Sequence, residues 1–308
     1  MKIIITFFFL FTAIMNASAK LKDYSQIDAY AKATPKTKEV TVATLAAYLI
    51  APAKGDSEKV RSIFIWITSH INYDWDAFEN GGGKWQEPMV TLESHKGVCQ
   101  NFCDLFTALS VASGMDAQTI IGYAKSNINT EWILNGFGSS NHVWNVVKVN
   151  KRWQLMEITW AQNTGNMNYF MEDPVMFRRD HLPLDARWQL TKDTLTLEQY
   201  ENMPILREGY DIYKVTHLTP SVGHIRGKKK IVFAFDSDHN VHLIARVNNY
   251  DYSDHTLPKF IPVITHTANH YTLTLTFVTE GTYWVSIDLD NSFYRIASYV
   301  VDTHVKGN

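Results

Sequence analysis

Residues 95–113 read HKGVCQNFCDLFTALSVAS, and they decide how the chain is organised. The bulky apolar residues of this stretch recur at helical spacing, at Phe102, Leu105, Phe106 and Leu109. Gly114 then supplies a C-terminal stop. Cys99 is therefore expected in the first turn of a helix, where unpaired backbone N–H groups and the helix dipole favour a thiolate. A nucleophilic cysteine would be placed there, although a helical cysteine is more often a small inert hydrophobe.

The second of the two cysteines, Cys103, follows Cys99 by one helical turn. Cβ atoms one turn apart are separated by about 5–6 Å, whereas a disulfide needs about 3.5–4.5 Å. We therefore predict two free thiols, with Cys103 facing the core. The alternative is a redox pair, because the two sulfur atoms would still be neighbours.

The first 19 residues, MKIIITFFFLFTAIMNASA, have the pattern of a cleavable export signal. Lys2 precedes an apolar run over residues 3–14, and Ala17-Ser18-Ala19 forms a small-residue cleavage site. The run is shorter than the about 20 residues of a membrane-spanning helix, so a retained anchor is the lesser alternative. We expect a periplasmic or secreted protein that begins at Lys20 and has no integral membrane span.

The charge of the expected mature chain argues against one class of partner. Removing Lys2 with the signal leaves 28 basic and 31 acidic residues, a net charge of −3. A nearly neutral chain lacks the positive charge that binding to phosphate backbones requires, so nucleic acid is not expected as a partner. The remaining length allows one large domain or two ordinary ones.

Helices are expected before the cysteine stretch. Two short ones fall between residues 20 and 52, and a longer amphipathic helix runs from an N-cap at Asp56-Ser57 to about His70. The following segment contains Gly81-Gly82-Gly83 and is interpreted as a surface loop rather than a mobile lid. After the cysteine helix we expect a strand over residues 117–123 and a polar loop over 125–140.

A β-hairpin is predicted next, because residues 141–149 and 152–160 are rich in β-formers and only Asn150 and Lys151 separate them. If Val149 pairs with Arg152, His142 faces Thr159 and lies diagonally from Glu157 on one face of the sheet. A slip of one residue would send Glu157 to the opposite face. The two-residue turn thus makes a contact between His142 and Glu157 feasible.

These residues supply the three parts of a cysteine, histidine and acid site. His142 would take the proton of Cys99 and later donate it to a leaving amine. Glu157 would fix the imidazole tautomer and stabilise its cationic form. The backbone N–H of Cys99 could be one donor to a tetrahedral oxyanion.

From about residue 215 the pattern changes to short β-branched and aromatic segments separated by turn residues. Six strands and no helix predict an immunoglobulin-like β-sandwich. The strands are expected at 230–235, 241–247, 261–266, 271–277, 282–288 and 294–302. We divide the chain into a signal at residues 1–19, a first domain at 20–213 and the sandwich at 214–308.

Several spaced motifs, in order along the chain, resemble the transglutaminase-like cysteine-peptidase superfamily. The core motifs are Gly97-Val98-Cys99, Asn141-His142-Val143-Trp144-Asn145 and, with three intervening positions, Trp153, Leu155, Glu157, Thr159 and Trp160. Residues 169–174 (YFMEDP), 181–183 (HLP) and 188–190 (WQL) are similar to the kyphoscoliosis peptidase and hillarin branch. The resemblance covers about residues 58–204 and implies a papain-like core, in which the cysteine helix packs on an antiparallel sheet.

By position, the resemblance makes Cys99 the nucleophile, His142 the base and Glu157 the third member. Glu157 departs from the family, which has Asp there. Its extra methylene moves the carboxylate by about a bond length, against a catalytic tolerance of about 0.5 Å. The resemblance also implies a second oxyanion donor upstream of Cys99, for which Trp85 and Gln86 are the candidates.

Other conspicuous residues receive a structural interpretation. The pairs His239/His242 and His266/His270 lie on expected strands, where such spacings do not converge on one ion. We therefore expect no metal and no organic cofactor. Trp144 and Trp160 are interpreted as core aromatic residues that frame the site.

The sequence as a whole predicts an α+β protein with a β-sandwich. Our first hypothesis is an exported thiol hydrolase or acyl transferase that acts on a peptide or protein substrate through a Cys99 thioester. The alternative is a binding or assembly module that keeps the fold without turnover, with its protein partner on the C-terminal β-domain.

Overall fold

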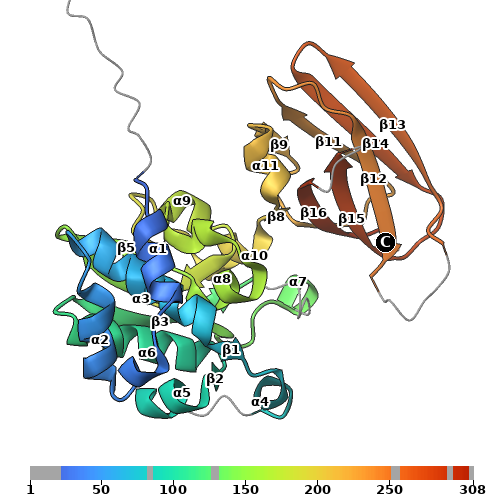
Figure 1. The fold of residues 1–308 in the computed structure, drawn as a ribbon. Helices are drawn as coiled ribbons and strands as arrows, with labels where there is room; N and C mark the ends of the chain where they lie inside the picture. Colours follow the sequence, from blue (N-terminus) through green and yellow to red (C-terminus); the bar gives the residue numbers. More distant parts are fainter. Residues whose placement is uncertain (1–21, 82–85, 126–131, 251–256, 290–293, 305–308) are drawn as a thin grey trace, which may run out of the picture.

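A computed structural model describes residues 22–81, 86–125, 132–250, 257–289 and 294–304. Two parts of the chain have separate hydrophobic cores and lie side by side (Figure 1). The expected export signal and the predicted loop residues Gly82 and Gly83 fall outside these ranges. Within these ranges, no helix combines the length and the apolar character needed to cross a bilayer.

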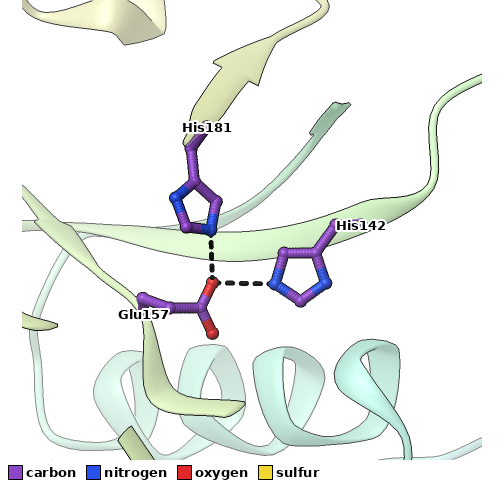
Figure 2. Close-up of side chains that lie close together, drawn as sticks. All are labelled: His142, Glu157 and His181. Carbon is purple, nitrogen blue, oxygen red and sulfur yellow. Dashed lines mark hydrogen bonds and ion pairs between the residues drawn. The ribbon is translucent and has the colours of Figure 1, made fainter. Parts of the chain in front are cut away.

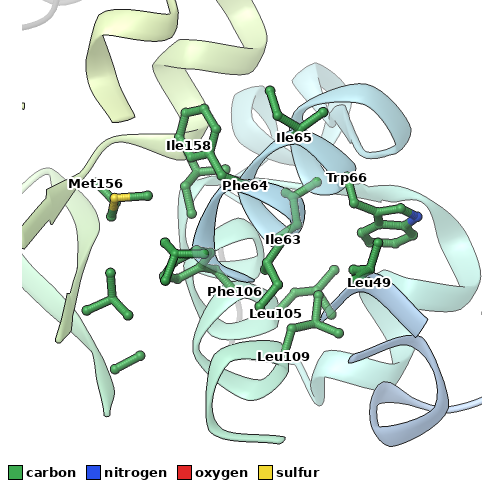
Figure 3. Close-up of a cluster of buried hydrophobic side chains, with 14 of the residues drawn as sticks. Leu49, Ile63, Phe64, Ile65, Trp66, Leu105, Phe106, Leu109, Met156 and Ile158 are labelled. Carbon is green, nitrogen blue, oxygen red and sulfur yellow. The ribbon is translucent and has the colours of Figure 1, made fainter. Parts of the chain in front are cut away.

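The first part begins with helices that build one core. They are α1 (Ser25–Lys32), α2 (Val42–Ile50), α3 (Asp56–His70), α5 (Pro88–Ser94) and α6 (Cys99–Ala112). The predicted helix at 56–70 is confirmed, but Gly55 is its N-cap and Asp56 lies in the first turn, where a carboxylate favours the dipole. Phe64 of α3 and Phe106 of α6 are fully buried in the core between them (Figure 3).

Against these helices lies an antiparallel sheet with the strand order β6-β5-β4-β3-β7. The strands are β3 (Ala117–Ala124), β4 (His142–Val149), β5 (Arg152–Met156), β6 (Phe170–Glu172) and β7 (His181–Pro183). The predicted hairpin register is confirmed, since Val149 pairs with Arg152 across a turn in which Asn150 and Lys151 have positive φ. Helix α6 packs on β4 and β3.

The second hairpin strand is shorter than predicted, and the pairing of His142 with Thr159 is wrong. Strand β5 ends at Met156, and Glu157 is the N-cap of α8 (Ile158–Thr164). The Glu157 side chain accepts a hydrogen bond from the Trp160 N–H at 3.0 Å. This capping starts a helix in a segment whose β-branched and aromatic residues favour a strand.

Short elements occupy segments that the sequence left as loops or irregular chain. Strands β1 (Asn72–Tyr73) and β2 (Lys96–Gly97) form a two-stranded parallel pair, and helix α4 (Trp75–Glu79) lies between them in the chain. Helix α7 (Trp132–Asn135) lies in the expected 125–140 loop. The other short elements are η1 (Lys36–Lys38), η2 (Met167–Tyr169), α9 (Pro174–Phe177), η3 (Ala186–Gln189), α10 (Leu197–Asn202), β8 (Ile205–Leu206) and α11 (Glu208–Ile212). Most of the short helices begin at an Asp, Asn or Thr whose side chain accepts a hydrogen bond from a backbone N–H of the first turn. The spacing of apolar residues does not reveal helices that start in this way.

The second part is a β-sandwich, and all six predicted strands are present. One sheet has the order β13-β14-β11-β9 and the other β10-β16-β15-β12. The strands are β9 (Thr216–Thr219), β10 (His224–Arg226), β11 (Lys230–Asp236), β12 (Leu243–Asn249), β13 (Phe260–Thr267), β14 (His270–Phe277), β15 (Thr282–Leu289) and β16 (Arg295–Asp302). With β9 as the first strand and β10 as its continuation, this is the immunoglobulin-like order, with an ABED sheet facing a CFG sheet.

The segment before residue 214 reaches into the second part. Strand β8 pairs with β16, and the Arg207 N–H donates to the Ile296 carbonyl at 3.0 Å. Arg179 forms an ion pair with Asp211. Backbone pairing with the C-terminal sheet therefore begins at Ile205, and the division at residue 213 stays a prediction.

Gly122 generates a prediction about stability. A Cβ at this position of β3 would lie 2.3 Å from the Leu182 carbonyl oxygen and 2.3 Å from the Trp144 ring. We expect Gly122→Ala to lower the free energy of unfolding by about 1–3 kcal/mol through overpacking. Gly138→Ala is the control, because a Cβ there meets nothing within 4 Å. Equal denaturation midpoints for the two variants would contradict this account.

Candidate active site

Cys99 is the first residue of α6, as the sequence predicted. The helix start is fixed by Asn101, whose Oδ1 accepts a hydrogen bond from the Val98 N–H at 2.9 Å. A Cβ on Gly97 would lie 2.5 Å from the Cβ of Asn101, so only glycine fits beneath this side chain. The Gly97-Val98-Cys99 motif thus has a packing reason as well as a chemical one. The Cys99 N–H is one of those that a helix start leaves without an intrahelical acceptor.

His142 is the first residue of β4 and pairs with Gly122 of β3. Its Nε2 lies 2.8 Å from Oε2 of Glu157, and Cys99 contributes to raising the pKa of the imidazole. Because Nε2 is engaged by the carboxylate, Nδ1 is the nitrogen that remains for the thiol. The Trp160 ring stacks on the imidazole with centroids 5.3 Å apart. The structure therefore brings the three residues chosen from the sequence together.

Glu157 is fully buried and receives three hydrogen bonds from three different elements. Its Oε1 accepts from the Trp160 N–H at 3.0 Å, and its Oε2 is shared by His142 at 2.8 Å and His181 at 3.1 Å (Figure 2). The contact with His142 arises at the end of β5 instead of diagonally across a continued strand. The carboxylate of Glu157, in place of the aspartate of the family, reaches His142 directly.

His181 is the residue that the sequence reasoning missed. It is the first residue of β7, it is fully buried, and its Nδ1 lies 2.6 Å from Oδ1 of Asp180. In the sequence, His181 was noted only as part of residues 181–183 (HLP), one of the segments that resemble the kyphoscoliosis peptidase and hillarin branch. The adjacent acid and histidine were a visible signal, but the pairing of β7 with β3 is what brings His181 to Glu157.

The electrostatics of the cluster favour charged groups. Burial opposes a charge on His142, but the Glu157 carboxylate and hydrogen bonds to Cys99 and Glu157 outweigh it and raise the His142 pKa to about 10. Burial likewise opposes the charge on Glu157, but His142 and His181 lower its pKa to about 2. The pKa of His181 is also raised, because Asp180 and Glu157 outweigh burial. An imidazolium on each side of a carboxylate is therefore the favoured state.

The cluster also has the composition of a metal site. One donor atom from each of His142, Glu157 and His181 lies within 4.8 Å of the others. Ligands of tetrahedral zinc, at about 2.0–2.1 Å from the ion, are about 3.3 Å from one another. The two nitrogen-to-oxygen distances here, 2.8 and 3.1 Å, are those of hydrogen bonds. The geometry fits proton-sharing groups better than a set of metal ligands.

The remaining sequence candidates have different positions. Cys103 is buried, donates its S–H to the Val143 carbonyl at 3.4 Å, and burial raises its pKa. Both cysteines are free, which confirms that prediction. Trp144 is fully buried, whereas Trp160 covers His142. Of the two proposed oxyanion donors, Trp85 lies outside the described residues and Gln86 is exposed.

A cavity of about 900 Å³ opens beside this cluster. Trp160 lines it, and its other walls include Tyr169, Glu172 and Arg207. Burial, followed by the nearby Asp180, raises the Glu172 pKa to about 7. Two polar atoms of these walls, Oε2 of Glu172 and Nε of Arg207, are buried without a hydrogen-bond partner among the described residues. The cavity thus offers polar groups next to the ring that covers His142.

Glu157→Gln should show what the buried charge contributes to folding. Removing one partner of a buried ion pair typically costs about 3–5 kcal/mol. The lowered Glu157 pKa stabilises the fold above pH 4.5, and this is lost as the pH falls toward 2. The raised His142 pKa stabilises it below pH 6.5, and this is lost as the pH rises toward 10.

Denaturation of the wild type and of Glu157→Gln across this range should therefore give a difference in unfolding free energy that is largest between about pH 4.5 and 6.5. Asp236→Asn is the matched control, since this carboxylate also binds two histidines, His217 and His270, but at the surface. We expect a much smaller loss there. If the difference in unfolding free energy between the wild type and Glu157→Gln does not vary with pH, the assignment of opposite charges to Glu157 and His142 is wrong.

Comparison with known proteins places part of the chain in a family. Residues 43–158 match the family model of the transglutaminase-like superfamily. Over 202 residues, or 62% of this chain, the sequence is 29% identical to human kyphoscoliosis peptidase, and over 210 residues, or 60%, it is 26% identical to hillarin of Drosophila melanogaster. The chain spans only 30% and 25% of those two proteins. The first part of this chain therefore carries a domain of the transglutaminase-like superfamily, in the branch of kyphoscoliosis peptidase and hillarin.

Proposed function

We propose that this protein is an exported cysteine hydrolase or acyl transferase that acts on a peptide or amide bond through a thioester on Cys99. The observation that carries the proposal is that His142, whose Nε2 binds the buried Glu157 carboxylate at 2.8 Å, also interacts electrostatically with Cys99 at the start of α6. Cysteine, histidine and carboxylate in this order activate a thiol for attack on carbonyl groups. The raised His142 pKa supports an imidazole that can hold a proton for the leaving amine.

In the first half of the reaction, the Cys99 thiolate attacks the carbonyl carbon of the amide. A C–S bond forms and the carbonyl electron pair moves to oxygen, where the Cys99 N–H can donate a hydrogen bond. The oxyanion then collapses, the C–N bond breaks, and the His142 imidazolium gives its proton to the leaving amine. The product of this half is a thioester and a neutral imidazole.

In the second half, water or an amine attacks the thioester while His142 takes its proton. The C–S bond breaks, the thiolate returns, and the acyl group leaves as an acid or as a new amide. Hydrolysis and transamidation share all steps up to the thioester. The nucleophile that reaches the site decides between them.

The position of the cavity supports a peptide segment as the substrate. Trp160 both lines the cavity and covers His142, so a peptide bound there would contact the ring that covers the proposed base. The unpartnered Glu172 and Arg207 atoms can bind backbone N–H and C=O groups of an extended peptide. No metal or organic cofactor takes part in the proposed steps.

A second candidate function is binding or assembly without turnover. The observation that favours it is the exposed β13, the last strand of its sheet, on which Ile261, Val263 and Ile264 are each about half exposed. Exposed apolar side chains on an edge strand are typical of interaction surfaces. The two candidates differ in what they expect of Cys99.

Alkylation by iodoacetamide at pH 7, followed by intact mass and peptide mapping, measures that difference. We expect Cys99 to be modified at least about tenfold faster than an ordinary thiol, since activation by a paired base is typically worth about 10²–10⁴-fold. His142→Ala should remove the acceleration, and Cys103 should stay unmodified in the folded protein because it is buried. If Cys99 reacts like an ordinary thiol and His142→Ala changes nothing, the enzymatic function is wrong and binding is favoured.

The export proposal has its own measurement. Expression of the full chain in a secretion-competent bacterial host should yield protein outside the cytoplasm whose intact mass corresponds to a chain that begins at Lys20. Replacing Leu10 by Arg should interrupt the apolar run and leave uncleaved protein in the cells. Uncleaved protein from the unaltered sequence would contradict the proposed signal.

A further inference from the structure

We propose that His181 is a positioning residue that holds the Glu157 carboxylate against His142, and that Asp180 fixes the orientation of the His181 ring. This inference rests on the proposed function, because it concerns how the base of that reaction is held. His181 does not touch Cys99 in any contact given by the structure. It acts through Glu157.

The first argument is the sharing of one oxygen atom. Oε2 of Glu157 accepts from Nε2 of His142 at 2.8 Å and from Nε2 of His181 at 3.1 Å (Figure 2). Glutamate has one more rotatable bond than aspartate, so a carboxylate at this position needs more contacts to hold it. The Trp160 N–H fixes Oε1 and His181 fixes Oε2, which leaves the carboxylate a single orientation toward His142.

The second argument is the proton balance. For both imidazoles to donate from Nε2 to one carboxylate, each must carry a proton there. Nδ1 of His181 lies 2.6 Å from Oδ1 of Asp180, a distance at which a carboxylate accepts a proton-bearing nitrogen. His181 is then an imidazolium between two carboxylates. The charges alternate along the series from Asp180 through His181 and Glu157 to His142.

The third argument is the rigidity of the His181 ring. It stacks on Phe177 with centroids 4.3 Å apart and lies 4.5 Å from the Trp160 ring. Its backbone is held in β7, where Ala124 of β3 is its partner. A ring that is packed against two aromatic rings and bound at both nitrogens can transmit an orientation to Glu157.

The test is the pH profile of Cys99 alkylation by iodoacetamide in the full chain. The charged or titratable groups that act on this cluster are Tyr73, Cys99, Cys103, His142, Glu157, Tyr169, Glu172 and Asp180, and Arg179 acts on Glu172. In His181→Leu the carboxylate of Glu157 loses a donor and a neighbouring cation, which raises its pKa. The acid limb of the profile should therefore move to higher pH by about one unit or more.

The plateau rate separates positioning from charge. We expect His181→Leu to lower it by about tenfold or more, the usual cost of losing a group that orients a functional side chain. His181→Gln keeps an N–H donor but no charge, so its plateau should stay within about threefold of wild type while its acid limb still moves. His217→Leu is the control, because it also removes a histidine that binds an aspartate, at the exposed surface. Its profile should match that of the wild type.

The outcomes separate the two proposals. In one outcome, Cys99 of the wild type reacts faster than an ordinary thiol, His142→Ala loses this acceleration, and the pH profile of His181→Leu superimposes on that of the wild type. This outcome overturns the role of His181 and leaves the proposed function standing. A wild-type Cys99 that is not accelerated overturns the proposed function and this inference together. If circular dichroism shows that His181→Leu is unfolded, the acid limb of His181→Gln decides, and an unmoved limb overturns the inference.

Discussion

The buried carboxylate of Glu157 joins the elements that surround the candidate site. It accepts hydrogen bonds from β4 through His142, from β7 through His181 and from the first turn of α8 through Trp160. A fully buried carboxylate without a charged or hydrogen-bonding partner would strongly destabilise the fold. Here the imidazolium groups of His142 and His181 compensate the charge of Glu157. The Trp160 bond is local, so the carboxylate is fully satisfied only when β4 and β7 also lie beside the end of β5.

Strand β3, which lies between β4 and β7, makes that arrangement possible. Gly122 lies between His142 of β4 and Pro183 of β7, and the absence of a side chain lets the Leu182 backbone and the Trp144 ring approach closely. On the opposite side of the site, Gly97 has the same role beneath Asn101 at the start of α6. Two glycines thus set the distances at which the proposed nucleophile and base are presented.

The departure from the aspartate of the family has a structural counterpart. Glu157 caps α8 with one oxygen and binds two histidines with the other, so its longer side chain is held at both ends of the carboxylate. His181 and Asp180 extend the series beyond the three residues of the family pattern. The cavity beside Trp160 meets this series only at Asp180, so Glu172 and Arg207, proposed for substrate binding, are distinct from the residues proposed to tune the base.

The sequence alone determined the elements that local patterns encode: the helix that begins at Cys99, the two-residue turn and register of the hairpin, and the six strands of the sandwich. It also selected Cys99, His142 and Glu157, because residue type and spaced motifs are visible without a fold. Only the tertiary structure decided that β5 ends at Met156 and that His181 completes the cluster. The physical reason is that a capping bond and a buried carboxylate shared by two strands depend on which segments become neighbours. That depends on strand pairing across the sheet, and no local periodicity records it.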